Sequence, residues 1–221
     1  SSLPTYIFSL FLRIQLVHIY SVSHNNDGAT MVNEVMDFSD AVEVVLEFYH
    51  QHPDETLVIV TADHETGGVG LGTRGYDLNL KLLSYQQNSL DVLSERLVSL
   101  REKRGGKVRW EEVKTVLSEE LGFWNEIEIT KEEEDVLKSE FECSYLQAGA
   151  ALRGLYAVVE PLAKQAVQLL NNKAGIGWTT PEHTGTRVPV YAIGAGAWRF
   201  DGSPLNNTDI PRIIAESAGW D

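Results

Sequence analysis

Asp63 and His64 follow an apolar run at residues 57–62 and precede Gly67 and Gly68, in the stretch TLVIVTADHETGG. A carboxylate oxygen and an imidazole nitrogen are ordinary ligands of zinc. A turn after the run can direct both side chains towards one ion, and the two glycines permit a tight turn and a close approach of the backbone. An Asp-His pair alone is weak evidence for metal ligation against a capping role or a simple surface turn, and the position after a buried strand strengthens the case for the metal.

Two further histidines lie in loops that border expected elements. His24 stands in SHNNDGAT just before a helix, and His183 stands in PEHTGT just before a strand. Neutral imidazole is a common metal ligand, although a lone histidine in a loop is usually solvated. We interpret His50 and His52, at the end of a helix, as solvated.

The elements around these residues predict an α/β protein. From Asp37 the apolar spacing is helical, with Asp37 or Ser39 as N-cap, and Pro53 ends the helix. The β-branched run at 57–62 is typical of a central parallel strand covered on both faces. Ligand sites in open α/β sheets lie beyond the carboxyl ends of strands, where Asp63 and His64 stand. A second short strand is expected at 188–194, and a final helix after Asn207 or Thr208.

Residues 76–172 have a different texture, with leucines at helical spacing and acidic runs such as KEEED. They predict a mostly helical insertion whose charges are solvated helix faces. The expected helices span roughly 77–103, 110–121, 131–142 and 144–172. An alternative is that this block is a separate helical binding module.

Composition narrows the classes of function. The chain has 221 residues, 43% hydrophobic and 23% charged, with a net charge of -14. This charge argues against nucleic-acid and anionic-membrane partners, which need a basic surface. A single cysteine, Cys143, excludes an internal disulfide and a zinc–thiolate cluster.

The first residues carry no identifiable signal peptide. Residues 3–22 are apolar, but Arg13 and His18 interrupt them and no small-residue cleavage site follows. The uninterrupted stretch is also too short for a membrane span. Because the chain begins at Ser1, we expect it to be the C-terminal part of a longer protein.

Three quoted stretches together resemble the C-terminal half of a bacterial alkaline phosphatase: SHNNDGATMVNEVMDFSDAVEVVLEFY, TLVIVTADHETGG and PEHTGTRVPVYAIGAGA. The resemblance is close over residues 23–75 and 150–221. It implies part of a doubly wound α/β sandwich, with a core at 23–75 and 173–221, a helical insertion at 76–172, and an atypical segment at 1–22 that is not native-like.

The resemblance also implies roles for individual residues. Asp63 and His64 match the family's Asp-His pair, which ligates one zinc. His183 matches the histidine of its E-H-T-G motif and His24 a third histidine, and these two ligate the other zinc. The chain departs from the family where a magnesium-ligand glutamate is replaced by Gln15 and a zinc-ligand aspartate by Tyr20. We expect both contacts to be lost, since an amide and a phenol are poor substitutes for carboxylates.

The function implied is hydrolysis of phosphate monoesters by a two-zinc, phosphoseryl mechanism in the full-length parent. The family's serine nucleophile, phosphate-binding arginine and bridging aspartate cannot be placed in this chain, so we expect the isolated chain to be inactive or nearly so. Family members bind zinc and magnesium, are commonly secreted or periplasmic, and are frequently homodimers. The magnesium site is doubtful here because its one candidate ligand is Gln15.

Two alternatives remain open at this stage. The chain could be a non-catalytic metal-binding remnant or pseudoenzyme, which the changes at Gln15 and Tyr20 favour. It could instead belong to a related metal-dependent phosphodiesterase or sulfatase-type hydrolase, since those enzymes have similar Asp-His zinc ligands. The surroundings of His183 favour the monoesterase. A further hypothesis is that residues 1–22 come from a disrupted or out-of-frame reading of the upstream coding sequence.

Overall fold

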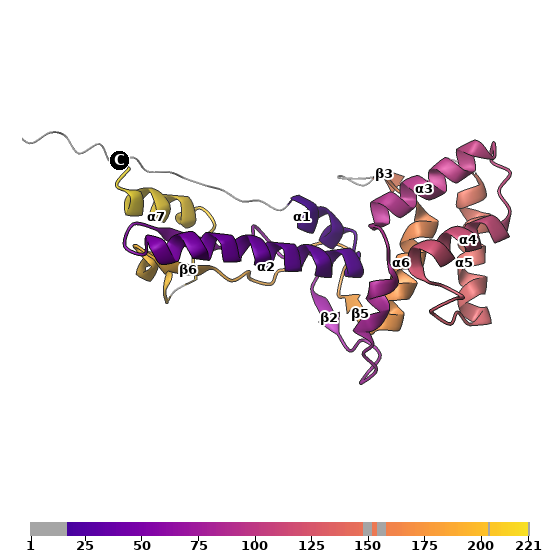
Figure 1. Cartoon of the computed structure of the whole chain (residues 1–221), viewed down its shortest axis with the longest axis horizontal. Helices are drawn as coiled ribbons and strands as arrows, with labels where there is room; N and C mark the ends of the chain where they lie inside the picture. Colours follow the sequence, from indigo (N-terminus) through magenta and orange to yellow (C-terminus); the bar gives the residue numbers. More distant parts are fainter. Residues whose placement is uncertain (1–16, 148–151, 154–157, 203, 221) are drawn as a thin grey trace, which may run out of the picture. The chain divides into compact units, whose positions relative to one another are not determined.

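The structure is a computed structural model that describes residues 17–147, 152–153, 158–202 and 204–220 (Figure 1). The chain divides into two compact units, each described here by itself. Among the described residues, the first unit comprises 38–65 and 186–220, and the second comprises 17–37 and 66–185. Gln15 and most of the predicted atypical segment lie outside the described residues.

The second unit is built around a block of four helices, labelled α3 to α6 in Figure 1. A hydrophobic core of leucines, valines and aromatic residues lies within this block, extends to the short strand β5, and includes the fully buried Leu97, Phe123 and Leu170. The elements are η1 (Leu80–Tyr85), α3 (Leu90–Lys103), α4 (Trp110–Leu121), α5 (Lys131–Cys143), η2 (Tyr145–Gln147), β3 (Leu152–Arg153), β4 (Val158–Val159), α6 (Pro161–Ala174) and β5 (Ile176–Trp178).

Local signals begin and end these helices. Thr130 and Glu133 form a capping box at the start of α5, with reciprocal side chain to backbone bonds of 3.3 and 2.9 Å. Gly122 and Gly175 end α4 and α6 in the left-handed conformation. The predicted helices at 110–121 and 131–142 are therefore confirmed.

Two predicted helices are wrong in extent. The expected helix at 77–103 is split into η1 and α3, because Ser89 caps the start of α3 through its side chain. The expected helix at 144–172 is replaced by η2, the strands β3 and β4, and α6. Helix α6 begins only at Pro161, where the buried Glu160 side chain accepts hydrogen bonds from the first turn.

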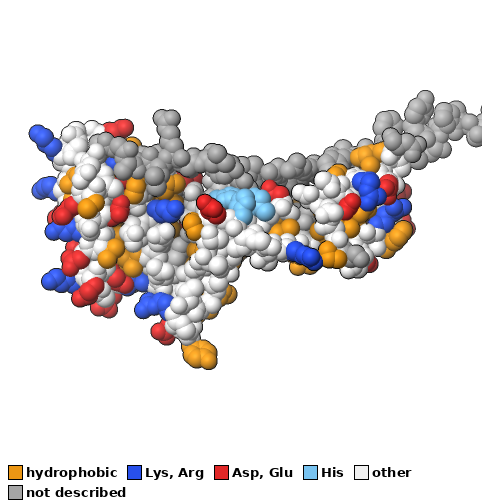
Figure 2. Space-filling view, turned by 180° about the vertical axis from the view of Figure 1, so that it is seen from behind, with side chains coloured by type: hydrophobic (Ala, Val, Ile, Leu, Met, Phe, Trp, Pro, Cys, Tyr) orange, Lys and Arg blue, Asp and Glu red, His pale blue; other side chains and the backbone are white. Residues whose placement is uncertain are grey.

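Charged side chains cover the helical block, and Figure 2 shows acidic and basic groups interspersed over it. Ion pairs link neighbouring helices: Arg96 of α3 contacts Glu119 and Glu120 of α4, and Lys173 of α6 lies 2.8 Å from Glu133 of α5. This distribution agrees with the interpretation of the charges as helix faces in water.

The second unit also contains α1 (Val17–His24), the first ten residues of α2 (Gly28–Gln51), and β2 (Val69–Leu71), which pairs antiparallel with β5. Helix α2 begins at Gly28, nine residues before the predicted start at Asp37. Asp27 supplies the cap, since its carboxylate accepts from the Thr30 hydroxyl at 2.7 Å and from the Thr30 N–H at 3.3 Å.

The first unit holds the rest of α2, β1 (Leu57–Val60), β6 (Tyr191–Gly194), η3 (Ala197–Phe200) and α7 (Asp209–Ala218). Strand β1 pairs with β6 in antiparallel register, with Leu57 opposite Gly194. The prediction of a central parallel strand is thus wrong for the described residues: β1 is partly exposed and has one neighbour. The predicted final helix is confirmed as α7, which begins after Thr208.

Apolar side chains remain exposed in this unit, including Phe48 at 57%, Tyr191 at 65% and Trp198 at 70%. Phe200 and Ile213 are its buried hydrophobic residues within the described part. Its core is therefore small. The predicted boundaries of the helical insertion, 76 and 172, stay a prediction, because compactness does not report which residues were inserted.

No helix among the described residues combines the length and the apolarity that are needed to cross a membrane.

Candidate metal centre

Asp63 and His64 lie close together just beyond the end of β1. The Asp63 Oδ1 atom accepts a hydrogen bond from the His64 backbone N–H at 3.0 Å. The other carboxylate oxygen, Oδ2, lies 3.7 Å from His64 Nε2. The Asp63 side chain is 71% exposed and that of His64 25% exposed, so the pair is open to an ion from solution.

The backbone sets the orientation of the His64 ring. Its Nδ1 atom lies 2.8 Å from the carbonyl oxygen of Glu65. Because a carbonyl can only accept, Nδ1 carries the proton in this contact and donates it. In the neutral ring the lone pair is then on Nε2, on the side of Asp63 Oδ2. Histidine ligands of metals are commonly oriented by such a bond from the other ring nitrogen.

The segment that carries this pair is tied to the neighbouring strand. The Thr61 hydroxyl donates to the Pro189 carbonyl at 3.0 Å, two residues before β6 begins. The antiparallel pairing of β1 with β6 fixes the preceding residues. Asp63 and His64 therefore lie just beyond the carboxyl end of a strand, as the sequence predicts.

His24 and His183 come together in the second unit, although 158 residues separate them in the sequence. Their ring centroids are 4.9 Å apart, and one ring nitrogen of each lies within 4.8 Å of the other. His24 is the last residue of α1, and His183 lies in the loop that follows β5. His24 is partly buried and His183 is exposed.

Gly67 shapes the loop that holds His183. The backbone N–H groups of Thr179 and Thr180 donate to its carbonyl at 3.0 and 3.2 Å. Gly67 has a φ of +103°, and a Cβ there would lie 2.3 Å from the Thr180 carbonyl oxygen and 3.1 Å from that of Glu182. A side chain at this position would push the loop away. The predicted need for close backbone approach at Gly67 is confirmed.

His24 is positioned by the turn that joins α1 to α2. Asn26 adopts a left-handed φ of 55°, and its carbonyl accepts from the Asn171 side chain of α6 at 2.8 Å. A Cβ on Gly28 would lie 2.4 Å from Ile176 and 2.5 Å from the Asn171 side chain. The turn can pack this closely against α6 and β5 because Gly28 has no side chain.

The donors in both pairs suit zinc. Imidazole nitrogens and a carboxylate oxygen form an all-nitrogen-and-oxygen set, and the Asp63 and His64 atoms already face each other. The predicted loss of a contact at Tyr20 stays a prediction: Tyr20 lies in α1, and its side chain is outside the described residues.

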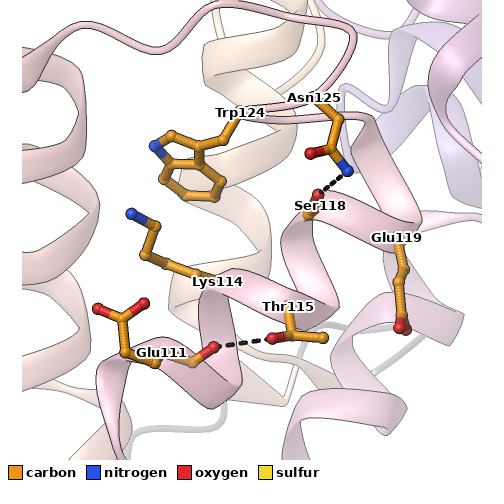
Figure 3. Close-up of a pocket in the computed structure, with 7 residues that line it drawn as sticks. All are labelled: Glu111, Lys114, Thr115, Ser118, Glu119, Trp124 and Asn125. Carbon is orange, nitrogen blue, oxygen red and sulfur yellow. Dashed lines mark hydrogen bonds between the residues drawn. The ribbon is translucent and has the colours of Figure 1, made fainter.

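A separate cavity of about 340 Å³ lies on α4 (Figure 3). Trp124 and Lys114 flank it, with the Lys114 ammonium 4.7 Å from the Trp124 ring centroid. Lys114 is also paired with Glu134 at 3.0 Å. None of the four predicted ligands lines this cavity, so it is not part of the candidate metal centre.

Asp27 is completely buried and is not among the residues predicted from the sequence to be functional. Its carboxylate accepts two hydrogen bonds from Thr30 and also bonds from the Leu90 N–H at 2.7 Å and the Gln86 side chain at 2.8 Å. The pattern NDGAT could have indicated an N-cap. No local signal indicates the bonds to residues about 60 positions away.

Comparison with known proteins gives a consistent result. The family model described as alkaline phosphatase matches residues 9–220. Alkaline phosphatase 4 of Bacillus subtilis is 28% identical over 205 residues, which cover 92% of this chain and 38% of the relative. The repressible alkaline phosphatase of Saccharomyces cerevisiae is 28% identical over 191 residues, covering 82% of this chain and 31% of the relative.

Among solved structures, a cold-active alkaline phosphatase from a psychrophilic Shewanella species is similar with a TM-score of 0.65 and 27% identity. That likeness covers 92% of this chain and 43% of the Shewanella chain. The chain thus spans less than half the length of the relatives it matches.

Proposed function

The chain belongs to the alkaline phosphatase family and has its α/β fold, and from this premise we propose that the protein it forms part of hydrolyses phosphate monoesters. The observation that carries the proposal is the arrangement of four side chains at family motif positions into two ligand pairs. Asp63 and His64 face each other across 3.7 Å, and the rings of His24 and His183 are 4.9 Å apart.

Each pair has a role in the proposal. Asp63 and His64 hold one zinc ion, and His24 and His183 contribute to the second. When bound, two such ions supply the positive charge that activates an oxygen nucleophile and stabilises the leaving oxygen at phosphorus. The Glu65 carbonyl keeps the Nε2 lone pair of His64 directed towards the ion. The bound ions also attract a phosphate dianion to a chain of net charge -14.

We expect the isolated chain to have weak turnover and weak magnesium binding. The serine nucleophile implied by the resemblance is not found at a matching position, so the isolated chain has little or no turnover. Magnesium binds weakly, because the family's glutamate position holds Gln15. A periplasmic or secreted location and a homodimer follow from the same resemblance and are part of this proposal.

Zinc affinity of the purified chain, measured by competition with a chromophoric chelator, tests the ligand assignment. We expect tight zinc binding that falls sharply in His64→Ala and in His183→Ala. His52→Ala is the matched control, because His52 lies in the turn after α2, where its ring packs against Phe48 in a tilted arrangement with the ring centroids 4.7 Å apart. An equal loss in His52→Ala, or no zinc binding by the unaltered chain, would contradict the assignment.

Hydrolysis of a chromogenic phosphate monoester on the same samples tests the catalytic part. The expected rate does not exceed a blank containing zinc alone. Turnover above that blank that disappears in His64→Ala would show that these 221 residues contain a nucleophile, against the proposal of an inactive isolated chain.

A further inference from the structure

The Asp27 carboxylate joins the turn after His24 to the helical block. Two of its hydrogen bonds are local, to the hydroxyl and the N–H of Thr30, and cap α2. The other two come from the segment 86–90, where α3 begins: the Leu90 N–H donates at 2.7 Å and the Gln86 Nε2 donates at 2.8 Å. An ordinary N-cap explains the first two bonds but not the second two.

Each residue between His24 and Asp27 is also held from the helical block. The Asn25 side chain donates to Asp91 of α3 at 3.2 Å, and the Asn26 carbonyl accepts from Asn171 of α6 at 2.8 Å. The backbone N–H of Asp27 donates to Val22 of α1 at 3.0 Å. The end of α1 that carries His24 is therefore fixed from two helices that lie more than 60 residues further along the chain.

Burial makes these bonds costly to lose. Asp27 is fully buried, and a buried carboxylate needs its donors because water cannot replace them. Burial and the nearby Asp27 charge raise the pKa of Asp91, whose carboxylate accepts from Asn25. Two acidic side chains, Asp27 of the turn and Asp91 of α3, thus accept hydrogen bonds where the turn meets the helical block.

We propose that Asp27 is a positioning residue that sets His24 beside His183, so that the helical block controls zinc affinity at this pair. The inference rests on the proposed function insofar as zinc is the ligand. The block then acts on the metal centre through the segment 86–90, instead of forming a separate binding module.

Two substitutions remove the long-range bonds from different sides. Asp27→Ser keeps a hydroxyl that can cap α2 but is too short to reach Gln86 and the Leu90 N–H. Gln86→Leu keeps the side-chain size and removes the donor. Leu137→Ala is the control for general loss of stability, since Leu137 is fully buried in α5, whereas the bonds to the turn described above come from α3, α6 and Gln86.

The first readout is zinc competition on the full chain. Partners that orient a metal ligand typically change metal affinity about 10–100-fold when removed. We expect losses of this size in Asp27→Ser, a smaller loss in Gln86→Leu, and unchanged affinity in Leu137→Ala at a temperature where all variants are folded. Unchanged affinity in Asp27→Ser, or an equal loss in Leu137→Ala, would overturn the proposal.

The second readout needs no metal and separates this proposal from the proposed function. Nuclear Overhauser contacts between the His24 and His183 rings, measured by NMR on the metal-free chain, report whether the rings are adjacent. We expect them in the unaltered chain and in Leu137→Ala, and their loss in Asp27→Ser. If the unaltered chain binds no zinc, the proposed function fails, and these contacts still decide the positioning role: contacts that persist in Asp27→Ser would refute it.

Discussion

The two ligand pairs of this chain are assembled in different ways. Asp63 and His64 are neighbours in the sequence, and their geometry depends on the end of one strand and on the Glu65 carbonyl. His24 and His183 are far apart in the sequence, and their approach depends on tertiary contacts of the turn at 24–27 and the loop at 179–183. A pair of the first kind can be recognised in sequence, whereas a pair of the second kind must be built by a folded core.

The hydrophobic cores of the two units also differ in how much they support their ligand pairs. In the second unit, a continuous core of leucines and aromatic residues supports the His24 turn through α3 and α6. In the first unit, Phe48, Tyr191 and Trp198 are largely exposed, and Asp63 and His64 rely on the two-stranded ladder of β1 and β6. We therefore expect changes in the helical block to affect the geometry of Asp63 and His64 less than that of His24 and His183.

The largest expected effect comes from deleting residues 76–172 and joining Gly75 to Lys173. Most of the core of the second unit and the partners of the His24 turn are removed, so we expect the contact between His24 and His183 to disappear. The bond between the Asp63 carboxylate and the His64 N–H should remain, because both residues lie outside the deletion. NMR of the histidine rings and of the His64 amide distinguishes the two. If the His24–His183 contact survived, the helical block would be a separate module.

A single substitution beside the loop that holds His183 tests the same comparison with a smaller change. Gly67→Ala places a Cβ 2.3 Å from the Thr180 carbonyl at a φ of +103°, and should cost about 2 kcal/mol or more of unfolding free energy and weaken zinc binding at His183. Gly185→Ala is the matched control in the loop that holds His183, with no atom within 4 Å of the added Cβ. The unfolding free energy of this control variant, measured by urea denaturation, should change by no more than about 0.5 kcal/mol. Equal effects of the two substitutions would show that the loop tolerates a side chain at Gly67.

Much of the local structure could be predicted from the sequence, and the failures have physical causes. Residues 110–121 and 131–142 are amphipathic and well capped, so their helices were found. The predicted parallel pairing of the strand at Leu57–Val60 is wrong, because an apolar run does not specify which strand pairs with it or in which direction. The start of α2 is predicted nine residues late, although NDGAT contains the local cap that Asp27 forms with Thr30; the further bonds of Asp27 from Gln86 and Leu90 could not be predicted, because they depend on the tertiary fold. In the site, the roles of His24 and His183 could be assigned by family motif, whereas their proximity required the fold.

The pH dependence of stability probes the helical block alone. Burial raises the pKa of Glu160, although bonds from Leu162 and Ala163 and the charge of Arg101 oppose it. The folded state thus favours the protonated carboxyl, and Glu160 adds stability at acid pH that is lost as the pH rises through its raised pKa. Glu160→Gln lacks this titration, so its stability relative to the unaltered chain should improve as the pH rises above about 4, the range in which an ordinary glutamate ionises. Parallel melting curves of both proteins provide the check, and a difference that does not change with pH would contradict it.

The smallest expected effect is at the end of β1. Thr61→Val removes the solvent-exposed hydrogen bond from the Thr61 hydroxyl to the Pro189 carbonyl. The unfolding free energy should fall by about 1 kcal/mol or less. Chemical denaturation gives this value, and zinc affinity at Asp63 and His64 should stay close to that of the unaltered chain. A loss of zinc affinity comparable to that in Asp27→Ser would mean that the two pairs are equally dependent on tertiary contacts.

The most direct test of the whole account is X-ray absorption at the zinc edge of the zinc-loaded chain. We expect nitrogen and oxygen ligands at about 2.0–2.2 Å, with an imidazole signal that weakens in His24→Ala and His183→Ala. A sulfur ligand at about 2.3 Å would identify Cys143 as the binding residue, and a spectrum unchanged by both substitutions would place the ion elsewhere. Either result would contradict the assignment of the metal centre.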